Sequence, residues 1–382
     1  MSRDTDQKSI YAPIRSRSEL WWKYGLLAAK DGHVNAAGMI SDALPQMIDE
    51  YLIPLYATSF RQATLDQPNA DYLFMVHAAK IAILRHWVPL AAQYELNGRQ
   101  IFDLDDQLVT LLRQTDLGEA TLEQWHAPYE AFYVRFGCQP EMRITFEGDE
   151  FEYLEGAYVA RTPFDGEGGM RLKFGFTTVK ADGRGVMLPG YFVDILPDEQ
   201  RLVVADAVDA AIARRLAEVG DRSEDDEATR AFKSHQRSEV NDSAELLRAG
   251  VKLLVNALFY LESIRVHQPS PEPGRDTPPE RVARWFQLPD RRRLKEQSAL
   301  TADGYAVVRL VGREASEAEI GSGGSDVRAH WRRGHWRQQR HGVGLALFKR
   351  LWIKPVLVAA NREDSTSLPG HVYTTGGIGG LQ

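Results

Sequence analysis

A short segment near the C-terminus carries the densest set of side chains that could bind or react: Ala329-His-Trp-Arg-Arg-Gly-His-Trp-Arg337. The triplet His-Trp-Arg occurs in it twice, at 330–332 and at 335–337. Arginine offers a planar fork for phosphate or carboxylate, and tryptophan offers an aromatic face for stacking. The pattern therefore indicates a surface for RNA phosphates and unstacked bases, or for a peptide held by Trp and Arg anchors.

We assign partner binding to this segment and to two residues that follow it. In an extended strand Trp336 would share a face with His330 and Arg332, unless Gly334 introduces a bulge. The alternative is a small core formed by the tryptophans, with Arg and His on its rim, and such a rim could still bind. The assigned residues are His330, Trp331, Arg332, Arg333, His335, Trp336, Arg337, Trp352 and Lys354.

The three histidines of this region invite two chemical readings, as metal ligands or as an acid–base pair. His330, His335 and His341 lack a nearby carboxylate or fourth ligand, so a metal site is a weak hypothesis. A metal-free ribonuclease with paired histidines stays open. The single cysteine, Cys138, excludes an intrachain disulfide and a cysteine-based zinc site. P-loop, His-Glu-x-x-His and Gly-x-Ser-x-Gly signatures are absent, so we expect no cofactor and favour binding over catalysis.

The charge of the chain is unevenly distributed along its length. Residues 321–360 hold eight Lys or Arg against one acid, Asp326, a net +7, which leaves −14 on the rest of a chain whose total is −7. Such asymmetry indicates a surface for an anionic partner. The alternative is a basic patch that docks on the acidic part of the same protein.

The targeting features of the sequence favour a cytoplasmic protein without membrane contact. Residues 1–13 are polar and lack the apolar segment of a signal peptide. The longest apolar helical stretch, 251–261, is far shorter than the ~20 residues that cross a bilayer.

Hydrophobic periodicity predicts an α+β fold. Three-to-four spacing predicts helices that begin at Ser18 and at Pro197, and further helices at 35–51, 71–87, 104–112 and 241–261. Alternation predicts strands at 132–136, 144–146, 153–160, 171–179, 186–195, 305–311 and 351–358, with Pro355 at an edge or bulge. The polar stretch 220–239 is typical of a linker, and Asn241 to Ser243 of a helix cap.

We expect four segments in the chain. Residues 1–125 form a helical domain, and 126–266 form an α+β domain with an antiparallel β-meander and packed helices. Residues 267–300 are a linker, and 301–382 form a small basic β-rich module with a flexible tail.

The C-terminal residues resemble the signature of the type V-A anti-CRISPR proteins. The resemblance rests on His330, the Arg332-Arg-Gly-His-Trp336 run, Trp352, Pro355 and the apolar strand ending near Asn361. Elsewhere the chain is similar only in the order of its elements.

This resemblance implies a phage or plasmid protein that evades host defence by down-regulating a type V-A RNA-guided nuclease. It implies that the protein recognises the nascent N-terminal peptide of the nuclease and triggers loss of its mRNA. The expected partners are then the nascent polypeptide, the translating ribosome or the mRNA, and no catalytic residue carries over. The alternative is an RNA-binding accessory protein or metal-free ribonuclease of a mobile element.

Overall fold

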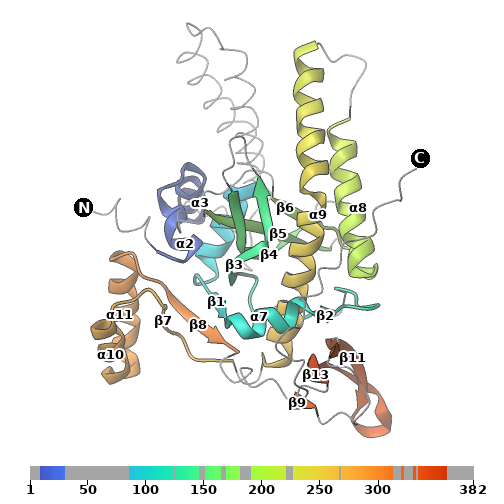
Figure 1. Cartoon of the computed structure of the whole chain (residues 1–382). Coiled ribbons are helices and arrows are strands. Elements are labelled where there is room, and N and C mark those ends of the chain that lie inside the picture. The colour runs from blue at the N-terminus through green and yellow to red at the C-terminus, as the bar shows by residue number, and fades with distance from the viewer. Residues whose placement is uncertain are drawn as a thin grey trace, which may run out of the picture.

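The computed structural model describes the chain in several ranges: 9–30, 86–123, 125–145, 151–164, 169–180, 191–220, 227–265, 268–312, 320–321, 330–332 and 334–358. The fold is α+β, as the sequence predicts, with helices packed on a mixed sheet (Figure 1). The helix predicted at 35–51 and most of that at 71–87 lie outside the described residues. Among those described, no helix is both long enough and apolar enough to span a lipid bilayer.

A seven-stranded sheet forms the centre of the molecule, in the order β6-β5-β4-β3-β1-β8-β7. The four strands β3 to β6 pair antiparallel in sequence order and confirm the predicted meander. The short strand β1 lies parallel to both β3 and β8. The bounds are β1 Ile101–Leu104, β3 Ala131–Thr145, β4 Phe151–Pro163, β5 Met170–Lys180, β6 Phe192–Ile195, β7 Glu272–Pro273 and β8 Val307–Val311.

Strand alternation divides the buried side chains between the two faces of this sheet. On β3, Phe132, Val134 and Phe136 enter one hydrophobic core, whereas Ala131 and Tyr133 enter another. The first core is covered by α7 (Asp106–Arg113), α8 (Val204–Glu218) and α9 (Glu227–Ser263). The second is covered by α2 (Ala12–Arg15), α3 (Leu20–Lys30) and the helical residues 86–96.

Helix α9 is longer than the sequence predicted, and at 227–239 it corrects the expected linker or mobile loop. The helix begins at Glu227 and continues without a break through Asn241 to Ser243, where a cap was expected. Ser243 donates from its hydroxyl to the carbonyl of Val240 at 3.1 Å and does not cap. Glu, Ala, Lys, Arg and Gln favour helix, so a polar composition here marks a solvated part of a helix instead of a linker.

The linker expected at 267–300 is also wrong, because this stretch contains two helices. They are α10 (Pro279–Gln287) and α11 (Asp290–Ala302), and each places an apolar residue, Trp285 and Leu300, in a small cluster with Val307 of β8. The central sheet takes strands from all four of the expected segments. Strand β1 comes from 1–125, β7 from 267–300 and β8 from 301–382.

A buried carboxylate joins these distant segments. Asp103 of β1 is fully buried and accepts hydrogen bonds from Tyr11 Oη at 2.8 Å and Arg135 Nη1 at 3.0 Å. Arg275, which follows β7, places its Nε 3.0 Å from the same carboxylate. Burial, followed by the charge of Asp103, raises the pKa of Tyr11, so its hydroxyl stays a donor. This cluster connects the N-terminal segment, β1, β3 and the residues after β7.

Candidate partner-binding surface

The predicted binding segment folds mainly as a β-hairpin. Strand β11 (Gly334–His341) pairs antiparallel with β12 (Leu347–Ile353), and the turn between them contains η6 (Val343–Leu345). Gly342 and Gly344 in this turn have φ values of 80° and 64°, which side chains with a Cβ rarely adopt. Figure 1 shows the hairpin at the end of α9.

The segment is divided between two small sheets, so its alternation is not continuous. Strand β10 (His330–Arg332) pairs with β13 (Val356–Val358), which in turn pairs with β9 (Ile320–Gly321). The hairpin instead extends onto β2 (Thr115–Asp116). Gly334 lies where these parts meet, and a Cβ on it would lie 2.7 Å from Pro355 Cδ and 2.8 Å from Thr115 Oγ1. Glycine is therefore required there for the close approach of β11 to β2.

The two tryptophans of the hairpin face inward and attach it to the body. Trp336 and Trp352 lie opposite each other in register, with stacked rings 6.1 Å apart. The Nε1 group of Trp336 donates to Oδ1 of the fully buried Asn256 at 2.7 Å. The Nε1 group of Trp352 donates to Oγ1 of Thr115 at 3.1 Å. These two indoles therefore anchor the hairpin. This agrees with the alternative interpretation, in which tryptophans of the segment form a small core.

One cation of the hairpin is also bound to the body. Arg350 donates from Nη1 to Glu262 Oε2 at 2.6 Å, and its guanidinium lies 3.7 Å from the ring centre of Phe259. Burial lowers the pKa of Arg350, against the raising effect of Glu262. Glu262 also accepts the backbone N–H of His126 at 3.0 Å. The contacts of Arg350 therefore agree with the alternative interpretation of the charge distribution, in which the basic segment docks on acidic residues of the same protein.

The opposite face of the hairpin is presented to solvent. Strand alternation places on it four exposed residues of β11: His335, Arg337, Gln339 and His341. From β12 it receives the exposed Lys349 and Leu347 and the half-buried Leu351 and Ile353. Arg337 donates to Gln339 Oε1 at 3.0 Å. In the part of the chain that the structure describes, no carboxylate pairs with Arg337 or Lys349, and the sequence has no Asp or Glu from 327 to 361. This face is therefore purely cationic in its charged groups.

The tip of the hairpin exposes apolar side chains. Val343 is 98% exposed, and Leu347 and Phe348 are more than half exposed. The guanidinium of Arg340 lies 4.9 Å from the ring centre of Phe348. An exposed group of apolar side chains is a candidate contact surface.

The assigned residues divide into three groups in the structure. His335, Arg337 and Lys354 are exposed, whereas Trp336 and Trp352 are half-buried against α9. His330, Trp331 and Arg332 belong to β10, but their side chains are not among those described, and Arg333 lies outside the described residues. Sequence reasoning missed the anchoring residues Thr115, Asn256 and Glu262, which no local pattern connects to the hairpin. It also left Arg340 and Lys349 off the assigned surface, although both were part of the charge count.

Two of the three histidines considered from the sequence lie too far apart to act as a pair. His335 and His341 are six residues apart on one strand, about 20 Å in extended backbone, which is too far for joint action on one bond. Within the described ranges no group of three His, Cys, Asp or Glu could hold a metal ion.

A cavity of about 330 Å³ lies between the edge strand β6 and helices α8 and α9. Apolar residues such as Ala211 and Phe192 line it together with charged ones, among them Arg215 and Asp194. The Oδ2 atom of Asp194 accepts from the buried Lys173 at 3.1 Å. Burial lowers the pKa of Lys173, against the raising effect of Asp194. Its size and mixed lining allow the cavity to take a side chain or a small ligand.

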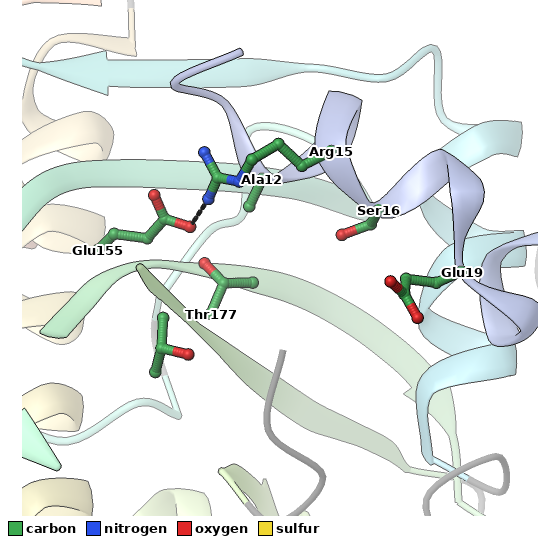
Figure 2. Close-up of a pocket in the computed structure, with 7 residues that line it drawn as sticks. Ala12, Arg15, Ser16, Glu19, Glu155 and Thr177 are labelled. Atoms are coloured by element: carbon green, nitrogen blue, oxygen red, sulfur yellow. Dashed lines mark hydrogen bonds and ion pairs between the residues drawn. The ribbon is translucent and has the colours of Figure 1, made fainter. Parts of the chain in front are cut away.

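Figure 2 shows a smaller cavity, beneath α2 and η1 (Ser16–Ser18) and above strands β4 and β5. Its volume of about 20 Å³ has room for a single water. Arg15 points across it and pairs with Glu155, and both side chains are buried. Burial raises the pKa of Glu155 to about 7, against the lowering effects of Arg15 and Arg135. We interpret this cavity as structural, because it is too small for a ligand.

The chain is thus an α+β protein that holds a cationic hairpin against helix α9. The chain belongs to the anti-CRISPR type V subtype A2 family (AcrVA2-like), whose family model matches residues 102–360. This match includes β1, the central meander and the whole hairpin, and it confirms the resemblance inferred from the C-terminal residues. A solved structure described as the crystal structure of AcrVA2 is similar over 90% of this chain and 96% of that chain, at 15% identity and a TM-score of 0.42. No curated protein matches the sequence.

Proposed function

We propose that this protein down-regulates a type V-A CRISPR nuclease by recognising its nascent N-terminal peptide and triggering loss of its mRNA. The observation that carries the proposal is the family match, which runs through the hairpin with its outward cations. The protein would act in the cytoplasm, where the message is translated, and would be encoded by a phage or plasmid that benefits from reduced host defence.

The surface proposed to meet the translation machinery is the exposed part of the assigned residues. His335, Arg337 and Lys354 supply it, because the hairpin is anchored by its other face. The three residues of β10 and Arg333 remain part of the proposed surface, because they are adjacent to the hairpin in the sequence. A partner with negative charge, such as the mRNA or ribosomal RNA, would complement this surface.

The peptide requires a concave site, and the cavity between β6 and α8 is the better candidate for it. Affinity for a short peptide comes largely from a few side chains buried in pockets. The cavity has the volume for such a side chain and offers Arg215 and Asp194 to the polar groups of a peptide. The proposal therefore separates peptide recognition from contact with RNA.

Co-expression with a tagged type V-A nuclease gene tests this function. We expect nuclease mRNA and protein to fall when the natural N-terminal peptide is encoded. A synonymously recoded start should preserve the effect, because the peptide is unchanged. A randomised N-terminal peptide should abolish it. Unchanged message and protein levels with the natural peptide would contradict the proposal.

A matched pair of variants tests the cavity. Ala211 lines it and is buried, whereas Ala213 lies two residues further along α8 and is exposed. Ala211→Phe should fill the cavity and restore the message, while Ala213→Phe should leave down-regulation intact. Thermal unfolding of both variants checks that the fold survives. Equal activity of a folded Ala211→Phe variant and the wild type would exclude this cavity as the peptide site.

The second candidate is an RNA-binding accessory protein of a mobile element, favoured by the acid-free basic stretch. It predicts RNA binding with no dependence on the N-terminal peptide of any nuclease. A fall in message that is identical for the natural and the randomised peptide would favour this candidate.

A further inference from the structure

We infer that the outer face of the β11–β12 hairpin is a binding surface for the phosphate backbone of single-stranded RNA, and that the tip supplies a base-stacking position. The inference names the partner of the surface described above. That the bound RNA is a translated message rests on the proposed function. The binding itself is a property of this chain alone and can be measured without the nuclease.

The charge of the face is the first observation. Arg337 and Lys349 lie on it, and Lys354 follows β12. None of the three has an ion-pair partner among the described residues, and the sequence has no acid from 327 to 361. A face with cations and no carboxylate matches a polyanion such as nucleic acid, whose phosphates are neutralised by Lys and Arg.

The spacing of the donors is the second observation. His335, Arg337, Gln339 and His341 follow each other at every second residue of β11, roughly 7 Å apart along the strand. Each can donate a hydrogen bond, so the row tracks a repeating acceptor over the length of the strand. A nucleic-acid strand has such a repeat in its phosphates, and a folded acidic protein does not.

The tip is the third observation. Phe348 is 54% exposed, and Arg340 lies over its ring. By strand alternation this pair is on the same face of the hairpin as Trp336, so an RNA strand would reach the ring by passing over the tip from the outer face. An exposed aromatic ring beside a guanidinium is the arrangement on which unpaired bases stack in proteins that bind single strands. In duplex RNA the bases are already stacked, so the tip favours a single strand.

The inner face explains why the outer cations are available. Trp336, Trp352 and Arg350 all engage the body, so the hairpin is held in place without the use of Arg337 or Lys349. Substitution of the outer cations should therefore change binding and leave stability unchanged.

The test uses the purified full-length chain and a fluorescein-labelled single-stranded RNA of mixed sequence. We expect binding that weakens with salt, because each phosphate contact releases a counterion. The double variant Arg337→Gln/Lys349→Gln should lower the slope of log K against log salt by about 1.4, since each contact with a single strand contributes about 0.7. Phe348→Ala should weaken binding with little change in slope.

The control removes the same charge elsewhere. Arg291 and Arg292 are exposed on α11, and Arg291→Gln/Arg292→Gln should leave both affinity and slope unchanged. Thermal unfolding should be the same for all these variants. Equal weakening by the two double variants would overturn the inference, because net charge and not the hairpin would then govern binding. Absence of RNA binding by the wild type would overturn it directly.

Two further outcomes separate this inference from its rivals. Displacement of the RNA by polyglutamate at equal charge would assign the face to an acidic protein and overturn the inference. RNA binding that depends on Arg337 and Lys349 supports it, even if nuclease message levels stay unchanged in cells. That last result would count against the proposed function alone.

Discussion

The indole of Trp336 donates from Nε1 to Oδ1 of Asn256 at 2.7 Å, and this bond joins residues 80 positions apart in the chain. Asn256 is fully buried in α9, and its Nδ2 group donates to the carbonyl of Thr115 at 3.1 Å. Thr115 in turn accepts the indole N–H of Trp352. A buried polar network therefore determines which face of the hairpin is turned outward, and each of its members is costly to leave unpaired.

A double-mutant cycle should measure this connection. Trp336→Phe leaves Asn256 Oδ1 without its donor, and Asn256→Leu leaves the indole N–H without its acceptor. Each single variant should lower the free energy of unfolding by about 1–3 kcal/mol. The double variant should lose about 1 kcal/mol less than the sum, because the two residues share one interaction. Urea denaturation measures all four proteins, and strict additivity would mean that the bond contributes nothing.

The ion pair of Arg350 and Glu262 should also stabilise the hairpin. Glu262→Gln weakens a charged hydrogen bond to a side chain that is only 11% exposed. We expect a loss of about 1.5–3 kcal/mol in the free energy of unfolding. The comparison is Asp209→Asn, which neutralises one of the two carboxylates paired with the exposed Arg248 and should cost less than about 1 kcal/mol. Equal losses in the two variants would show that burial has no role in the Arg350 pair.

Asp103 should be among the most sensitive polar positions in the described fold. Asp103→Asn leaves the guanidinium groups of Arg135 and Arg275 without their buried counter-charge. We expect a loss of about 3–5 kcal/mol, as for other buried ion pairs that lose one partner. Asp303→Asn is the matched control, because Asp303 pairs with Arg281 but is 55% exposed. Chemical denaturation that ranks Asp303→Asn as the more damaging change would contradict this assignment.

The buried Glu155 should make stability depend on pH. Its folded pKa, about 7, lies above the ordinary value of 4.5, so the native state binds the proton more tightly than the unfolded state between these values. Stability from this group is complete below pH 4.5 and is lost as the pH rises toward 7. The slope should reach at most about 1.4 kcal/mol per pH unit.

Glu155→Gln isolates this contribution, because glutamine does not titrate. Denaturation of both proteins from pH 4.5 to 8 should show the wild type losing stability relative to the variant as the pH rises. Glu141→Gln, at a side chain that is 61% exposed, should parallel the wild type. A difference between wild type and Glu155→Gln that stays constant over this range would mean that the pKa of Glu155 is not raised.

Local patterns predicted much of the fold, because the spacing of apolar residues shows which side of a strand or helix packs against its neighbours. The alternation in 132–136 and in 171–179 identified strands β3 and β5, and the meander followed from the turns between strands. Composition was a poor guide at 227–239, because a polar helix and a polar linker have similar residues. Composition was also misleading at 267–300, because its proline-rich start is typical of a linker although two helices follow it.

The amino-acid sequence alone shows that a basic, acid-free stretch with paired His-Trp-Arg triplets lies near the C-terminus, and that this stretch resembles the anti-CRISPR family to which the chain belongs. That Trp336 and Trp352 face α9 while Arg337 and Lys349 face solvent is visible only in the folded protein. A strand always has two faces, and the partners that select one of them, Thr115 and Asn256, come from elements far away in the chain.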